Sequence, residues 1–236
     1  MFFAFGAKPQ DHAGTQPSAG DPLEPAIEAA RRTRDEQQLR TLLSQVQRRA
    51  SEKGGDAAAH FDSALVHSYL ADTLEMRKDR KAAAKEVDQA IEAVERSIRL
   101  EEKSADAHSL LADLYGRKIS LGNAMFAGPK YGPKVKEENK RAMELDEKNA
   151  RVWASLGRQY LMAPKMFGGD IAKSIESFQK SLALNDRQDD TWVWLAQAFV
   201  KQGDKAKARE ALGRAESLNP GSPFAKSVAS LVQVER

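Results

Sequence analysis

The stretch DDTWVWLAQAFVKQGDKAKAREALGRAESLNP, residues 189–220, predicts two short helices joined by a tight turn. Its first helix places apolar side chains on one face, at the i, i+3, i+4 and i+7 spacing: Trp192, Leu195, Ala196 and Phe199. Gly203 ends this helix, because glycine adopts the left-handed cap conformation without a Cβ clash. Asp204 then caps the second helix through its side-chain oxygen, and Pro220 closes the unit because proline cannot continue a helix.

The second helix of this stretch carries a seam at helical spacing: Ala208, Leu212 and Ala215. Together these positions resemble a tetratricopeptide repeat, a unit of about 34 residues with bulky, small and aromatic residues at fixed offsets. The matching residues are Trp192, Leu195, Ala196, Phe199, Gly203, Ala208, Ala215 and Pro220. The resemblance implies an all-α fold, a right-handed solenoid of antiparallel helix pairs that bury their apolar faces against one another.

The same pattern recurs upstream, so the resemblance covers roughly two-thirds of the chain. The predicted repeats are 64–104, 105–149, 150–186 and 187–220, within a repeat domain of residues 56–220. Residues 24–55 are expected to form an N-terminal helical cap, either one long helix or two helices broken near Thr33. Residues 221–236 are expected to form a C-terminal capping helix, because a terminal repeat would otherwise expose its apolar face.

Three connections depart from the family pattern. The turn of the first repeat, around residues 77–80, is predicted to be longer than the family norm by about seven residues. Residues 121–134, LGNAMFAGPKYGPK, contain two Gly-Pro pairs and are predicted to form a loop. Residues 163–170, APKMFGGD, are predicted to form an extended turn in which two glycines supply unusual backbone angles and Asp170 caps the next helix.

The N-terminus, residues 1–23, is expected to be a flexible segment. Residues 8–25 are rich in Pro, Gly, Ser, Thr, Gln and Asp, a composition that buries too little apolar surface to order itself. The apolar patch from Phe2 to Phe5 is far too short to span a bilayer. Residues 1–7 resemble the end of a secretory signal; the alternative is a disordered terminus with chance phenylalanines. The localisation therefore stays open between exported (periplasmic or secreted) and cytoplasmic.

Composition excludes several classes of function. The 236 residues contain no cysteine, which excludes disulfides, thiolate catalysis and cysteine-ligated metals. The net charge is only +3, so a dedicated nucleic-acid surface is not expected. His67 and His108 fall in bulky packing positions and are interpreted as structural. His60 and His67 lack the further ligands that zinc needs. We find no catalytic constellation, and we expect no enzyme activity, no metal and no cofactor.

The family register assigns a partner-binding groove to the first helix of each repeat. The expected groove residues are Asp113, Arg117, Arg151, Arg158, Met162, Val193, Gln197 and Lys201. This groove would be more acidic toward its N-terminal half, and apolar and basic toward its C-terminal half. It would suit a peptide with an apolar anchor and an acidic end. Trp194 either packs against the preceding repeat or is an exposed binding anchor.

Lys130, Tyr131 and Lys134 lie in the predicted 121–134 loop, which is either a solvated basic loop or a contact loop for an acidic partner. The function favoured by the resemblance is a protein-interaction scaffold that binds a protein or peptide in its concave face. The alternative is an exported accessory protein that holds a small ligand or lipid in the solenoid cavity. A closed apolar cavity beside four residues would favour this alternative: Met125, Phe126, Met166 and Phe167.

Overall fold

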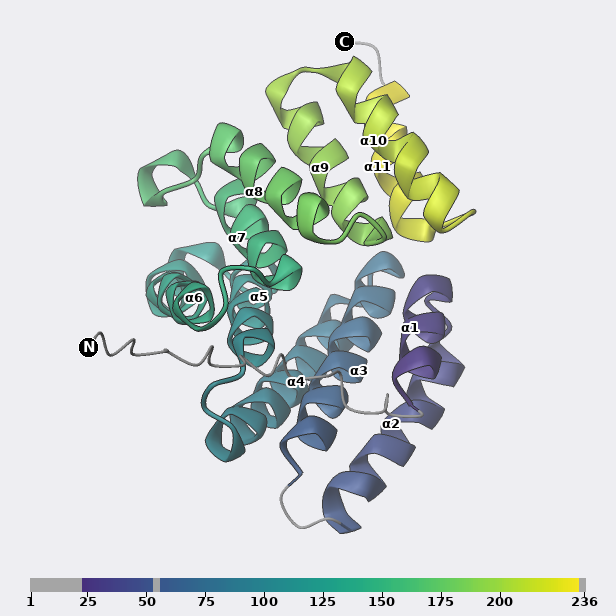
Figure 1. Ribbon diagram of the computed structural model, residues 1–236, viewed down its shortest axis with the longest axis vertical. Coiled ribbons are helices and arrows are strands. Elements are labelled where there is room, and N and C mark those ends of the chain that lie inside the picture. The colour runs from purple at the N-terminus through teal and green to yellow at the C-terminus, as the bar shows by residue number, and fades with distance from the viewer. Residues whose placement is uncertain (1–22, 53–55, 234–236) are drawn as a thin grey trace, which may run out of the picture.

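The protein is described by a computed structural model that covers residues 23–52 and 56–233, and all regular structure in those ranges is helical (Figure 1). In chain order the helices are α1 (Glu24–Thr33), α2 (Glu36–Glu52), α3 (Ala57–Met76), α4 (Arg80–Leu100), α5 (Ala105–Leu121), α6 (Ala124–Leu145), α7 (Ala150–Met162), the 3-10 helix η1 (Lys165–Phe167), α8 (Ile171–Leu184), α9 (Asp189–Gln202), α10 (Lys205–Leu218) and α11 (Pro223–Gln233). The predicted all-α helical-repeat fold is confirmed. The signal-like segment, residues 1–7, and the last three residues of the predicted N-terminal cap, 53–55, lie outside the described residues.

Four helix pairs stack in sequence: α3 with α4, α5 with α6, α7 with α8, and α9 with α10. The first helices of successive pairs also meet, since α5 contacts both α3 and α7. At the N-terminal end α2 packs on α3, and at the C-terminal end α11 packs on α9 and α10. Residues 24–52 form two helices, because Arg34 adopts the left-handed conformation (φ 54°) directly after α1.

Side-chain caps start most of these helices. Asp56, Asp170 and Asp204 each accept hydrogen bonds from backbone N–H groups in the first turn of α3, α8 and α10. The turn from α9 to α10 uses Gly203 at φ 90°, in the left-handed region where glycine avoids a Cβ clash. These local signals could be read from the sequence because capping depends on neighbouring residues alone.

The turn of the first repeat is short, so the prediction of a long turn was wrong. α3 ends at Met76 and α4 begins at Arg80, and the additional residues lengthen the two helices instead. Lys78 takes the left-handed conformation here (φ 64°), and the Asp79 N–H bonds to the Leu74 carbonyl at 2.9 Å. The Asp204 N–H bonds to the Phe199 carbonyl in the same way. Lys78 therefore occupies the turn position that Gly203 holds in the fourth repeat.

The predicted loop at residues 121–134 was also wrong. After Asn123 caps the chain, α6 runs from Ala124 through both Gly-Pro pairs, and Pro129 and Pro133 lie inside the helix. Tertiary contacts on α5 override the weak helix propensity of this stretch. Tyr131 stacks on Tyr115, with ring centroids 5.7 Å apart.

The three tryptophans of the repeats are half-buried. The indole N–H of Trp153 donates to the Glu147 carbonyl (2.7 Å), and that of Trp192 donates to the Asp186 carbonyl (2.8 Å). The rings of Trp153 and Trp192 are both partly shielded from solvent, and Trp192 packs against the C-terminal core. Trp194 meets Phe224 of α11 edge to face at 5.1 Å and packs against the C-terminal core, so it is not a free binding anchor.

Candidate functional site

Charged side chains form ion pairs between the first helices of neighbouring repeats. We call this set the inner network; it comprises Asp72 and Glu75 of α3, Asp106, Asp113 and Arg117 of α5, Arg151 and Arg158 of α7, and Asp189 and Asp190 of α9, together with Arg31 and Arg34 from α1. Figure 1 shows the helices that carry it side by side. The network coincides with the face on which the sequence placed a binding groove.

Within the repeats, each arginine meets a carboxylate of the preceding repeat. Arg158 Nε donates to Asp113 Oδ1 at 2.9 Å, and Arg151 Nε donates to Asp106 Oδ1 at 3.1 Å. Arg117 lies 2.8 Å from Asp72 and also contacts Glu75. Burial raises the pKa of Asp72, but attraction to Arg117 and Arg34 outweighs it and lowers the pKa overall. The carboxylates of one repeat therefore pair with the arginines of the next along this network.

The N-terminal helix joins this network to the last repeat. Arg31 contacts Asp189 and lies 2.6 Å from Asp190, and Arg34 bridges Asp190 and Asp72 at 2.9 Å each. The Asn219 amide donates to Asp189 at 2.7 Å. Figure 1 shows α1 below α9 and α11, so the two ends of the repeat array meet. We call this contact the α1–α9 clasp; no sequence pattern indicated it.

The predicted groove residues divide into three groups. Asp113, Arg117, Arg151 and Arg158 are members of the inner network: Asp113 pairs with Arg158, Arg151 pairs with Asp106 of α5, and Arg117 pairs with α3. Val193 is buried in the C-terminal core, so it does not line a groove. Gln197 is half-buried, and its side-chain oxygen finds no hydrogen-bond partner among the described residues.

Two predicted groove residues are open to solvent beside each other. Met162, at the end of α7, is 53% exposed. Lys201 of α9 is exposed, and its ammonium group donates to the carbonyl of Leu161 at 2.9 Å, which places it next to Met162. Arg158 lies one helical turn before Met162. This corner joins an apolar side chain to the Lys201 ammonium and to an arginine that is paired with Asp113. An exposed apolar side chain beside a lysine suits a partner with an apolar residue near a carboxylate.

Lys130, Tyr131 and Lys134 belong to α6 and not to a loop. The Lys130 ammonium lies 5.1 Å from the Tyr131 ring centroid, and the Lys134 ammonium lies 4.9 Å from the Tyr115 ring centroid. These lysines therefore shield an aromatic pair that anchors α6 on α5, while their charges remain exposed.

The two repeat histidines are buried and make matching contacts. His67 Nδ1 lies 2.7 Å from Glu86 of α4, and His108 Nδ1 lies 2.6 Å from Glu138 of α6. The hydrogen bond to His67 lowers the pKa of Glu86. Each pair ties the first helix of a repeat to the second. In the described ranges no group of His, Cys, Asp and Glu side chains is arranged to hold a metal ion.

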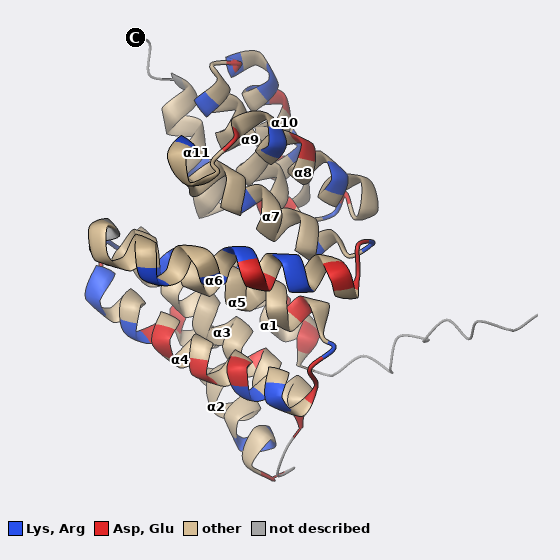
Figure 2. Ribbon diagram, turned by 90° about the vertical axis from the view of Figure 1, so that its left-hand side faces the viewer, with Lys and Arg blue, Asp and Glu red and all other residues tan. Residues whose placement is uncertain are grey.

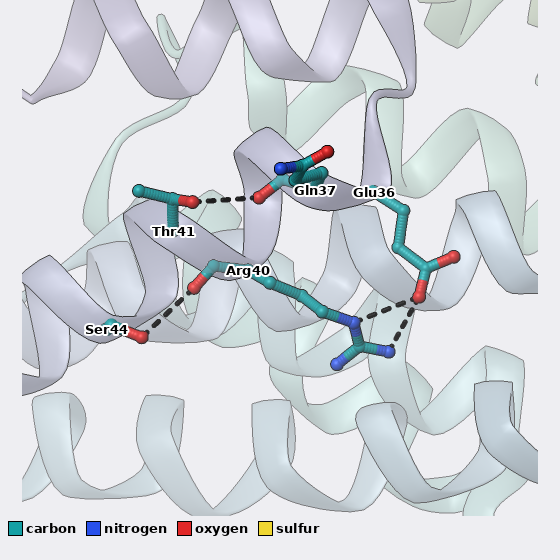
Figure 3. A pocket seen from close by; sticks show the side chains of 5 residues that line it. All are labelled: Glu36, Gln37, Arg40, Thr41 and Ser44. Carbon is teal, nitrogen blue, oxygen red and sulfur yellow. Dashed lines mark hydrogen bonds and ion pairs between the residues drawn. The ribbon is translucent and has the colours of Figure 1, made fainter.

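Two hollows on the surface are lined by polar and charged residues. One of about 540 Å³ lies along α2 beside Glu36, Gln37, Arg40, Thr41 and Ser44 (Figure 3). Another, of about 350 Å³, lies between His108 and the acidic and basic residues of α6. Neither is beside Met125, Phe126, Met166 or Phe167, which are all exposed. The closed apolar cavity that would favour a bound small ligand or lipid is not found at those four residues.

The sequence matches one protein-family model, and the structure is similar to several solved structures. The model described as TAtT, TRAP transporter T-component, matches residues 45–231. No curated protein matches the sequence. Among solved structures, TTC0263, a thermophilic TPR protein of Thermus thermophilus, is similar with a TM-score of 0.63 and 16% identity, over 89% of this chain and 98% of that chain. This likeness supports the tetratricopeptide-repeat fold.

Two further structures are more distant. YrrB, a TPR protein with an unusual peptide-binding site, gives a TM-score of 0.44 at 13% identity, over 89% of this chain and 98% of that chain. MamA gives a TM-score of 0.40 at 15% identity, over 86% of this chain and 96% of that chain.

Proposed function

The chain belongs to the TAtT family of TRAP transporter T-components, and on that basis we propose that it is a non-catalytic, protein-binding component of a TRAP transporter. The observation that carries the proposal is the family match over residues 45–231, which spans the repeats from α3 to α10 and most of the C-terminal cap. Stacked helix pairs provide an extended surface whose usual role is to bind another protein.

The corner formed by Arg158, Met162 and Lys201 is the proposed contact for the partner. The inner network, including Arg158 with Asp113, is already paired within the chain, whereas Lys201 forms no ion pair with a carboxylate of the described residues. At the corner, Met162 supplies exposed apolar surface. An exposed apolar side chain next to a cation favours a partner that presents an apolar residue close to a carboxylate.

Affinity purification of the full chain from its source cells, followed by mass spectrometry, tests this proposal. The unmodified chain should recover protein subunits of a TRAP transporter. Met162→Asp and Lys201→Glu should each reduce that recovery at least about tenfold, the equivalent of about 1.4 kcal/mol. Leu184→Asp, at a similarly exposed position at the end of α8, should leave it unchanged.

Arg158 needs a paired design, because Arg158→Glu alone would place two carboxylates together. The exchange Asp113→Arg with Arg158→Asp keeps the internal ion pair while it reverses the charge at the corner. This double variant should fold normally and lose the partner. Recovery of the transporter subunits by all of these variants would exclude the corner, and failure of the unmodified chain to recover any would contradict the proposed function.

A further inference from the structure

Four large apolar side chains stand out on the surface. Met125 is 77% exposed, Phe126 73%, Met166 83% and Phe167 58%. They form two short tips, one at the start of α6 and one in η1, the turn between α7 and α8. We call these residues the apolar tips. Repeat packing does not need them, since the buried face of α6 is supplied by Val135, Asn139 and Ala142.

The two tips lie on the same edge of the molecule. In Figure 1 α6 and the α7–α8 turn both reach the left-hand edge, and Figure 2 shows α6 running across the side that faces the viewer. The α7–α8 turn approaches the middle of α6, because a Cβ placed on Gly168 would lie 3.7 Å from the Lys136 ammonium, about three helical turns after Met125 and Phe126. Pairing of Tyr131 with Tyr115 and burial of Val135 hold the N-terminal half of α6 in place. The tips are therefore presented by fixed elements.

The two sequence segments that carry the tips are basic. Residues 121–136 and 163–169 contain lysines and no Asp or Glu. Lys130, Lys136 and Lys165 are exposed, and none forms an ion pair with a carboxylate of the described residues. The cations at this edge are all lysines, whereas the arginines of the inner network are paired.

We propose that the apolar tips and the lysines between them bind the surface of an anionic lipid bilayer. Peripheral helices that lie on membranes combine Phe and other apolar residues with Lys, and each lysine near an anionic surface adds to the affinity. Protein interfaces, by contrast, are depleted of Lys and enriched in Arg. Among the described helices none is long and apolar enough to cross a membrane, so the contact is with the surface. This inference does not depend on the proposed transporter partner.

The absence of cysteine allows a direct test with single labelled sites. Phe126→Cys and Phe167→Cys, each carrying a polarity-sensitive fluorophore, are compared with Leu231→Cys on α11, which is also exposed. Vesicles of phosphatidylglycerol and phosphatidylcholine should raise and blue-shift the emission at positions 126 and 167 but not at 231. Vesicles of phosphatidylcholine alone should have little effect, and about 0.5 M salt, roughly five times the ionic strength that gives a 10 Å Debye length, should reverse the change.

Vesicle flotation of the unlabelled full chain supplies the second measurement. The double variants Met125→Ser with Phe126→Ser and Met166→Ser with Phe167→Ser should each weaken binding at least about tenfold. Single Lys→Gln changes at Lys130, Lys136 or Lys165 should weaken it about fivefold each. A variant with serine at Phe2, Phe3 and Phe5 should bind as the unmodified chain does. Loss of binding in that variant, with binding intact in the tip variants, would overturn the proposal.

Two other results would also overturn it. One is the absence of any anionic-lipid effect at positions 126 and 167. The other is protection of both labelled sites by a co-purified protein in the absence of vesicles, since this would assign the tips to a protein interface. Circular dichroism of each variant checks that α6 is retained; the substituted side chains are exposed, so no loss of helix is expected.

Discussion

Arg31 and Asp189 are 158 residues apart in sequence, and their side chains are in direct contact where the first helix meets the last repeat. Asp189 is only 1% exposed, and Arg31 is nearly as buried. Burial lowers the pKa of Arg31, but its hydrogen bond to Glu28 and the attraction of Asp190 outweigh burial and raise that pKa overall. Burial raises the pKa of Asp189, but the attraction and hydrogen bond of Arg31 outweigh it and lower that pKa, so both groups remain charged. The clasp thus turns a linear stack of repeats into an array whose two ends support each other.

Arg31→Ala should destabilise the protein by about 3 kcal/mol, because it leaves the Asp189 carboxylate buried with only Asn219 as a partner. Equilibrium denaturation in guanidinium chloride measures this loss. The matched control is Arg96→Ala, which removes an exposed pair with Glu92 and should change the free energy of unfolding by about 0.5 kcal/mol or less. Equal effects of the two substitutions would show that the clasp adds nothing to stability.

Acid should weaken the clasp and the inner network. The pKa values of Asp189 and Asp72 are lowered in the folded protein, because their arginine partners outweigh the effect of burial. In the unfolded chain the pKa of an aspartate is about 3.9. The stabilisation is therefore present above about pH 4 and is lost as the pH falls through the lower, folded-state values.

The expected result is a free energy of unfolding that is level from about pH 7 to pH 5 and falls steeply below about pH 4. Asp189→Asn should lower the free energy of unfolding at neutral pH. It should also make the fall of that free energy below about pH 4 less steep, since one group that binds a proton more readily in the unfolded chain is removed. An unchanged slope in this variant would mean that Asp189 has the same pKa in the folded and unfolded states.

Lys78→Gly should stabilise the protein by about 1 kcal/mol. Lys78 adopts a left-handed backbone conformation, which a side chain with a Cβ disfavours by about 1–2 kcal/mol, and part of this gain is offset by the flexibility of glycine in the unfolded chain. The converse change, Gly203→Ala, should destabilise the fourth repeat, although a Cβ there meets no atom within 4 Å. Thermal melts of the two variants should shift in opposite directions.

Gly157→Ala tests how closely the paired helices approach. A Cβ on Gly157 would lie 2.6 Å from the ring of Phe178, which is fully buried, so the substitution should cost about 1–3 kcal/mol. Gly213→Ala in α10 is the matched control, because its Cβ would enter open space and should stabilise the helix by about 0.5–1 kcal/mol. If both variants gained stability, the packing of α7 on α8 would be looser than described.

The repeat fold was predictable from the sequence because its signals are local. Helix periodicity, Gly203 and the capping aspartates act within a few residues, and they located α9 and α10 correctly. The α1–α9 clasp could not be found in this way, since its two partners carry no shared pattern. The register named the groove positions but not their pairing, because pairing of Asp113 with Arg158 depends on the spacing of neighbouring repeats.

The contact of Trp194 was also not predictable from local sequence patterns. Its position on α9 indicates the helix face on which it lies. The sequence does not indicate its neighbour on that face, Phe224 of the capping helix, which follows the last repeat. The Gly-Pro pairs of α6 gave a strong local signal for a loop, and that prediction was wrong. The contact of Tyr131 with Tyr115 in another helix overrides the local signal.

Alanine substitutions in α6 distinguish the helix from the loop that its Gly-Pro pairs favour. A Cβ on Gly128 or Gly132 meets no atom within 4 Å, and neither glycine has positive φ. Gly128→Ala and Gly132→Ala should therefore each stabilise the protein by about 0.5–1 kcal/mol, as expected for glycine inside a helix. Pro133→Ala should also stabilise it, because it restores a backbone N–H donor to the helix. In a loop that needed glycine conformations the same alanines would destabilise, so the sign of the change in the denaturation midpoint decides between the two structures.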